Sequence, residues 1–174
     1  MLALLIVMTT YFSNSGGSLF LKTKKVQADT GETTLAMSQA MSRNKIPAIG
    51  RAASEGLWAM TAGGHRVFCL NSGKTMCSGD TLKYKTVNAA TYEKKGIAKA
   101  LQWYFMKSNK NTKALALTQA YIWACGHGAN KQNTVYQAGK NVQKGYSQND
   151  AKKFCKMISD QDPEGTIYYL SLIH

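Results

Sequence analysis

The first half of the chain alternates short apolar runs with glycine-rich turns, which is typical of antiparallel strands. Residues 57–60 and 65–70 are two such runs, separated by four residues that include two glycines. This arrangement predicts a β-hairpin. Side chains alternate along a strand, so Val67 and Cys69 are expected on one face and Phe68 on the other. Residues 84–87 predict a further strand.

The second half has helical periodicity. In residues 91–106, apolar side chains recur three and four positions apart, which predicts a helix. Residues 112–125 are apolar on almost every face and predict a buried helix, which Gly126 and Gly128 should end.

A third helix should begin at Ser147, because Asp150 stands at the capping-box position three residues later. After a turn at residues 162–165, the β-branched and aromatic residues 166–173 predict a final strand. Residues 29–45 are polar and are expected to be partly helical, and residues 44–50 resemble a linker. Strands and helices occur in separate runs, which predicts an α+β fold: a β-sheet or sandwich layer with a connected helical insert.

Composition and charge limit the partners. The chain has 174 residues, enough for one domain with its own core. Its 22 Lys and Arg against 9 Asp and Glu give a net charge of +13, which favours acidic partners. The lysines are dispersed and form no compact basic stripe, so we expect no nucleic-acid partner. No segment is apolar for long enough to suggest an integral membrane helix.

The N-terminus has features of an export signal. Residues 2–7 form a short apolar region, and small residues precede Asp29. We therefore expect residues 1–28 to be a signal peptide, and the four cysteines agree with an oxidising exterior. The signal is atypical, because a basic start is missing and lysines lie between the apolar region and the cleavage site. The alternatives are a true start further upstream, or a buried strand that begins at Met1.

Two short motifs carry the chemical interpretation. Phe68, Cys69 and Leu70 precede the run Thr-Gln-Ala-Tyr-Ile-Trp at residues 118–123 by about fifty residues. A cysteine after an aromatic residue, followed at this separation by Thr-Gln-x-x-Ile-Trp, resembles the thioester domains of Gram-positive surface adhesins. The resemblance covers roughly residues 56–170, and Cys77 departs from the family pattern.

The resemblance implies a function. In that family the cysteine thiol condenses with the glutamine side chain to form an internal thioester, which then reacts with a lysine amine of a host protein. By this resemblance, Cys69 and Gln119 form the cross-link at the seam between the sheet and the helical part, with no cofactor and no metal. Residues 29–174 would be the thioester domain of a longer secreted or cell-surface protein, a covalent binder that acts once and not an enzyme.

Three further residues are supporting candidates. Thr118 can bond the acyl oxygen or a helix carbonyl, and these roles stay open. Trp123 lies one helical turn after Gln119 and is expected to exclude water from the bond. His127 is a candidate proton carrier, ahead of His65.

The remaining cysteines allow one disulfide, and helix packing favours Cys125 with Cys155, although a reduced pair is almost equally expected. Two rival functions also remain open. One is a cysteine hydrolase or acyltransferase with Cys69 as nucleophile and His127 as base, and the other is a cationic protein that binds without chemistry.

Overall fold

The structure is a computed structural model that describes residues 4–9, 30–47, 54–70 and 77–172. These residues form six strands and four helices. The strands are β1 (Leu4–Thr9), β2 (Thr30–Pro47), β3 (Ser54–Ala62), β4 (His65–Cys69), β5 (Thr81–Asn88) and β6 (Thr166–Leu172), and the helices are α1 (Lys95–Met106), α2 (Thr112–His127), α3 (Lys131–Val142) and α4 (Gln148–Ser159).

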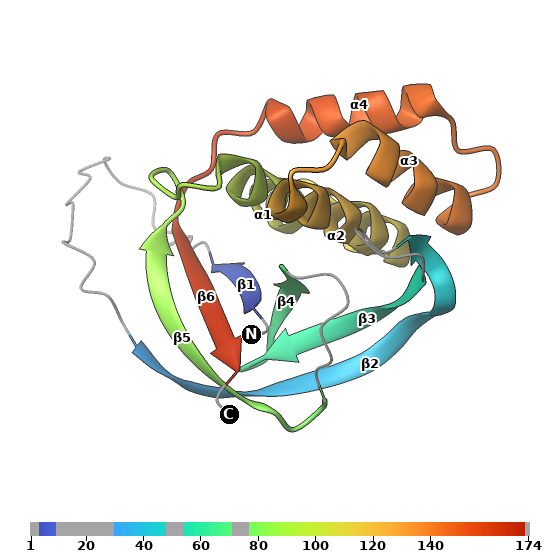
Figure 1. Ribbon diagram of the computed structural model, residues 1–174. Helices are drawn as coiled ribbons and strands as arrows, with labels where there is room; N and C mark the ends of the chain where they lie inside the picture. The colour runs from blue at the N-terminus through green and yellow to red at the C-terminus, as the bar shows by residue number, and fades with distance from the viewer. Residues whose placement is uncertain (1–3, 10–29, 48–53, 71–76, 173–174) are drawn as a thin grey trace.

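All strand pairs are antiparallel, in the order β1-β4-β3-β2-β5-β6. β1 also pairs with β6, so the sheet closes on itself. The helices form a second layer across one side of this curled sheet (Figure 1). The chain is therefore a mixture of helix and sheet in separate runs, in agreement with the α+β prediction.

The hairpin of β3 and β4 is as predicted. Ala62 pairs with His65 across a two-residue turn of Gly63 and Gly64, and both glycines have positive φ, 55° and 79°. Two positive φ values define the turn that matches the twist of paired strands, and glycine adopts them without strain. Val67, Phe68 and Cys69 are all buried, so both faces of this part of β4 are covered.

The helices leave and re-enter the sheet at neighbouring points. β5 leads into α1, and the chain returns from α4 into β6, which pairs with β5 from Leu82 to Asn88. Asn88 pairs with Thr166, so the two ends of the helical part lie side by side. The expected helical insert is present.

Helix ends follow their sequence signals. Ser147 and Asp150 form a capping box at the start of α4, with the Ser147 side chain accepting from the Asp150 N–H. Gly128, in the left-handed conformation, ends α2. The predicted end at Gly126 is too early, since α2 continues to His127.

Two segments differ from the predictions. Residues 30–47 are strand β2, so a partly helical segment at 29–45 is wrong, as is a linker over residues 44–47. Residues 48–50 lie outside the described part. α3 was not expected from the sequence, because it buries only Val135, Ala138 and Gly139 and has a weak apolar stripe.

The apolar segment near the N-terminus lies in the sheet. Leu4–Thr9 form β1, which pairs with both β4 and β6. This arrangement corresponds to the alternative in which the segment is a strand of the fold. The cleavage site predicted before Asp29 lies outside the described residues, and a signal peptide over residues 1–28 stays a prediction.

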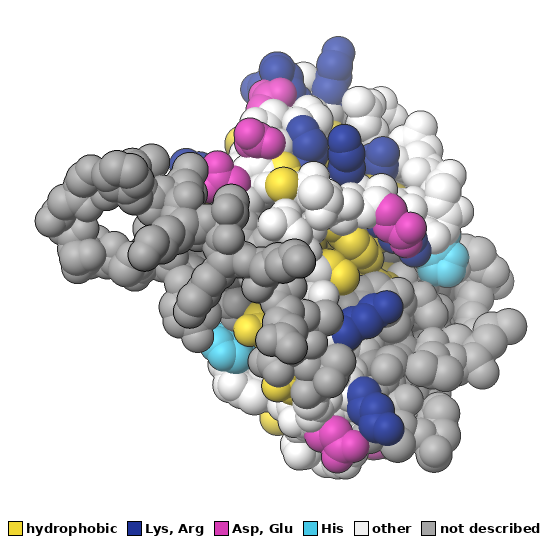
Figure 2. All heavy atoms as spheres, turned by 90° about the vertical axis from the view of Figure 1, so that its left-hand side faces the viewer, with side chains coloured by type: hydrophobic (Ala, Val, Ile, Leu, Met, Phe, Trp, Pro, Cys, Tyr) yellow, Lys and Arg dark blue, Asp and Glu magenta, His cyan; other side chains and the backbone are white. Residues whose placement is uncertain are grey.

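Basic side chains are spread over the surface. On the described part of the face in Figure 2, Lys and Arg side chains are dispersed and acidic side chains lie among them. Among the described residues, the ion pair within 4.0 Å joins Lys156 to Asp160. The described basic side chains on this face thus form no compact patch.

Candidate functional site

The side-chain amide of Gln119 is hydrogen-bonded to the backbone of Cys69 at both of its polar atoms. The Cys69 N–H donates to Gln119 Oε1 at 3.0 Å, and Gln119 Nε2 donates to the Cys69 carbonyl at 2.6 Å. Cys69 is the last residue of β4, and Gln119 lies in the middle of α2. The fold thus brings together two residues that are fifty positions apart in the sequence.

The pairing follows from strand geometry. In a strand, the N–H and C=O of one residue point to the same edge. At Cys69 both groups are directed to the Gln119 amide, whereas the described pairs between β3 and β4 extend only to Met60 and Val67. The glutamine side chain therefore takes the position that a neighbouring strand would occupy.

The pair is buried. Cys69 is 5% exposed and Gln119 is 3% exposed. Residues Ala114 to Ala124 of α2 are all buried, as expected for a helix that is apolar on every face. An unpaired amide in such a place would cost about 1–3 kcal/mol, and the two bonds to Cys69 remove this cost.

A glycine allows the end of α2 to approach β4. A Cβ placed on Gly126 would lie 3.0 Å from the carbonyl oxygen of Leu70, which follows Cys69. The sequence interpretation treated Gly126 only as a helix stop and missed this contact. A glycine seven residues after the glutamine, on an otherwise apolar helix, is a signal that could have indicated it.

Thr118 and Trp123 lie on the same helix as Gln119. Thr118 is fully buried and Trp123 is 5% exposed. Among the described residues, neither Thr118 Oγ1 nor Trp123 Nε1 has a hydrogen-bond partner. Each is thus a buried polar group whose hydrogen-bonding capacity is unused beside the central glutamine.

The histidines lie further away. His127 is the exposed last residue of α2, eight positions and therefore about 12 Å along the helix axis from Gln119. His65 is exposed at the opposite end of β4 from Cys69, beside a separate pocket of about 290 Å³. The structure does not bring either imidazole into hydrogen-bond contact with Cys69 or Gln119.

The other cysteines have different environments. Cys77 is exposed, and its N–H donates to Asp80 at 2.7 Å. Cys125 and Cys155 carry free thiols, so the expected disulfide is not formed here. Burial raises the pKa of each thiol to about 11, and the neighbouring Cys125 also raises the pKa of Cys155. The two thiols are thus close enough to interact, and both are protonated at neutral pH.

In the described part of the chain, no three His, Cys, Asp or Glu side chains gather in a way that could hold a metal ion. None of the four described helices has both the length and the apolar character that a bilayer crossing needs. Comparison of the chain with protein-family models, with curated proteins and with solved structures finds no match.

Proposed function

We propose that Cys69 and Gln119 condense to an internal thioester, and that the chain is an adhesin module that attaches covalently to its target. The observation that carries the proposal is the pair of hydrogen bonds between the Gln119 amide and the Cys69 backbone. These bonds hold the amide beside the residue that carries the thiol. Preorganisation of this kind can be worth effective molarities of about 10⁵–10⁸ M.

The two bonds also suit the chemistry of condensation. Attack of the Cys69 sulfur on Gln119 Cδ places negative charge on Oε1, which already accepts the Cys69 N–H. A donor aimed at the atom where charge develops stabilises the transition state. The C–N bond then breaks, and Nε2 leaves as ammonia with the proton of the thiol. The products are one thioester and one ammonia.

The thioester would then react with a partner. A lysine amine attacks Gln119 Cδ, an amide forms, and Cys69 leaves as a thiol after taking up the proton that the amine loses. Burial of both residues and the neighbouring Trp123 supports slow hydrolysis in the absence of a partner. The net charge of +13 favours a host or surface protein with an acidic face around the reactive lysine.

In this proposal the pair lies at the seam between sheet and helices, and the protein acts on the bacterial cell surface or after secretion. A cysteine hydrolase is less well supported, because it needs a base near Cys69, and the described contacts of Cys69 and Gln119 include no imidazole. A cationic protein that binds without chemistry would need only the charge and would leave the Cys69–Gln119 contact without a role.

Intact-mass measurement of freshly purified protein tests the proposal. The wild-type chain should lack one ammonia relative to its sequence, and Cys69→Ala and Gln119→Ala should each restore the full mass. Cys77→Ala is the matched control, because Cys77 is exposed and is not part of the proposed cross-link. This variant should still lack one ammonia. An ammonia loss that persists in Cys69→Ala would refute the assignment.

A second measurement separates the binder from an enzyme. Methylamine should give one stoichiometric adduct at Gln119 and release the Cys69 thiol. Repeated turnover of a substrate by the wild-type protein, lost in Cys69→Ala, would favour the hydrolase instead.

A further inference from the structure

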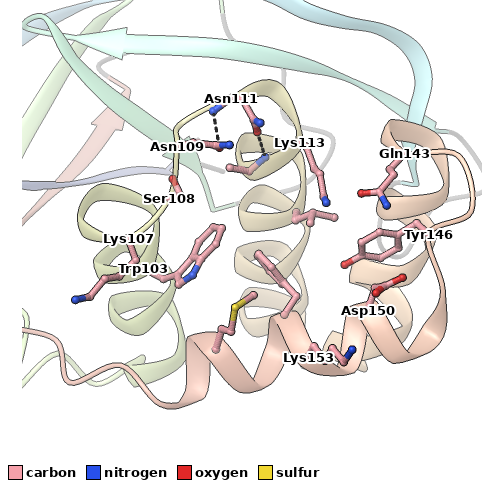
Figure 3. A pocket seen from close by; sticks show the side chains of 14 residues that line it. Trp103, Lys107, Ser108, Asn109, Asn111, Lys113, Gln143, Tyr146, Asp150 and Lys153 are labelled. Atoms are coloured by element: carbon pink, nitrogen blue, oxygen red, sulfur yellow. Dashed lines mark hydrogen bonds between the residues drawn. The ribbon is translucent and has the colours of Figure 1, made fainter.

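A second candidate site lies among the helices, on the opposite side of α2 from Gln119. It is a cavity of about 570 Å³ between the C-terminal end of α1, the N-terminal half of α2, the residues after α3, and α4 (Figure 3). Ala114 and Leu117 of α2 line it. Gln119 is two residues beyond Leu117, about 200° further around the helix, so the cavity and the Cys69–Gln119 pair lie on different faces.

The floor of the cavity is aromatic. Trp103 of α1 and Phe154 of α4 pack edge to face with ring centres 4.8 Å apart, and Tyr146 lies across the cavity from Trp103 (Figure 3). Phe154 and Tyr146 are buried, whereas Trp103 is half-buried. Aromatic surfaces of this size are the usual walls of small-ligand sites, whose volumes are about 300–1,000 Å³.

One buried polar group in the wall has no partner. Tyr146 is 6% exposed, and among the described residues its hydroxyl makes no hydrogen bond. Figure 3 shows this hydroxyl directed toward the interior of the cavity. A buried hydroxyl without a partner costs free energy, so a ligand that supplied the bond would recover it.

The rim is basic and rich in amides. Lys113 lies 5.7 Å from the centre of the Tyr146 ring, and Lys107 and Lys153 stand at other points of the rim. The carboxyl of Asp150 is already bonded to Ser147, and these bonds, helped by the charges of Lys153 and Lys113, lower its pKa. No ion pair within 4.0 Å joins these lysines to an acid in the described residues.

We propose that this cavity binds an acidic sugar, a pyranose ring that carries a carboxylate or a sulfate. The apolar face of the ring packs on Trp103, a sugar hydroxyl bonds Tyr146, and the acidic group lies between Lys113 and Lys153. Asn109, Asn111 and Gln143 provide further polar groups at the rim. The site is independent of the thioester, since no residue of the Cys69–Gln119 pair lines it.

Titration with glucuronic acid, followed by NMR through the backbone N–H signals of residues that line the cavity, such as Ser108 and Leu117, tests the proposal on the full chain and again on Cys69→Ala. Both proteins should bind it equally, and glucose and inorganic sulfate should bind more weakly. Trp103→Ala should weaken binding about tenfold or more, Tyr146→Phe about threefold to tenfold, and Lys113→Gln about threefold to fivefold.

Two variants serve as matched controls. Trp58 is an exposed tryptophan on β3, and Lys83 is an exposed lysine on β5, so Trp58→Ala and Lys83→Gln should leave the affinity unchanged. Tyr146→Phe and Lys113→Gln remove no core packing, so a loss of binding in them cannot be attributed to unfolding. Equal affinity for glucuronic acid and glucose, or for glucuronic acid and sulfate, would overturn the proposal, as would no binding at all.

Discussion

Gly139 of α3 leaves the space that the ring of Tyr146 occupies. A Cβ built on Gly139 would overlap that ring, so the absence of a side chain at this position sets where Tyr146 lies. The proposed sugar site thus depends on a glycine that does not itself line the cavity.

Gly139→Ala should therefore destabilise the fold. Displacing a buried ring costs about 1–3 kcal/mol, which exceeds the gain of about 1 kcal/mol from replacing glycine by alanine in a helix. Urea unfolding measures the difference. Asn133→Ala, at an exposed position of the same helix, is the control and should change stability little. A Gly139→Ala protein at least as stable as wild type would show that Tyr146 can move without cost.

Gln119→Ala should destabilise the protein even where no thioester can form. In the Cys69→Ala background the substitution removes the two hydrogen bonds between the Gln119 amide and the backbone of residue 69, and a buried hydrogen bond contributes about 0.5–1.5 kcal/mol. The comparison of Cys69→Ala with the double variant by urea unfolding isolates the two hydrogen bonds. Equal stability would mean that water or another group replaces the amide.

Gln119→Glu should make stability depend on pH. A buried carboxylate is disfavoured, so the pKa of Glu at this position should be raised. The protonated acid can still donate to the carbonyl of residue 69, as the amide does. The variant should then be most stable below the unfolded pKa of glutamate and lose stability as pH rises through the folded pKa. Thermal unfolding of Cys69→Ala/Gln119→Glu between about pH 4 and pH 7 would measure this, and a flat profile would contradict it.

Ser147→Ala should weaken the start of α4. Loss of an N-cap side chain costs about 0.5–2 kcal/mol, and the hydrogen bonds from Ser147 are the main cause of the lowered pKa of Asp150. The pKa of Asp150 should therefore rise in the variant, which an NMR titration of its carboxyl would detect. In the wild type, stability from this carboxyl is present above its unfolded pKa and is lost as pH falls through the folded pKa.

The thiols of Cys125 and Cys155 should be unreactive in the native protein. Their pKa values of about 11 leave almost no thiolate at pH 8, and the thiolate is the reactive form. Iodoacetamide should label exposed Cys77 first and label the other two only after unfolding. Rapid native labelling of Cys155 would contradict this.

The same two thiols predict a loss of stability in alkali. The stability that the two protonated thiols contribute is fully present below the pKa of an unfolded cysteine, near 9.0. It is lost as pH rises through their pKa in the folded protein, about 11. Because lysines also titrate there, the measurement is the difference between wild type and Cys125→Ala/Cys155→Ala in urea unfolding at pH 8 and pH 10. Equal pH dependence would show that the thiols do not contribute.

The sequence correctly predicted those elements whose formation depends on a few neighbouring residues. The turn of Gly63 and Gly64, the capping box at Ser147 and the all-round apolar α2 each have a local physical cause. β2 was missed because its polar residues occupy exposed positions, and only Leu35 is fully buried in the stretch from Gly31 to Ser38. Strand pairing between β2, β3 and β5 holds that segment, and pairing over long distances leaves little trace in a local pattern.

The candidate site was predictable only in part. The spacing of the two motifs indicated that Cys69 and Gln119 would meet, but not that backbone groups of Cys69 would hold the amide. No local sequence pattern indicated the cavity among the helices, because Trp103, Tyr146 and Lys153 lie on three different segments. Their proximity depends on α3, which the sequence did not reveal.

The helical insert is joined to the sheet where Asn88 pairs with Thr166, and its helices contact the sheet at several further places, one of which is where α2 meets β4. A thioester between Cys69 and Gln119 would make the contact between α2 and β4 covalent and would close a ring in the chain, because the two residues are fifty positions apart. Such a ring restricts the unfolded chain and so resists opening. Reaction with a partner would open this ring. The domain that has reacted should therefore unfold at a lower temperature and under a lower force than the domain in which the thioester is intact.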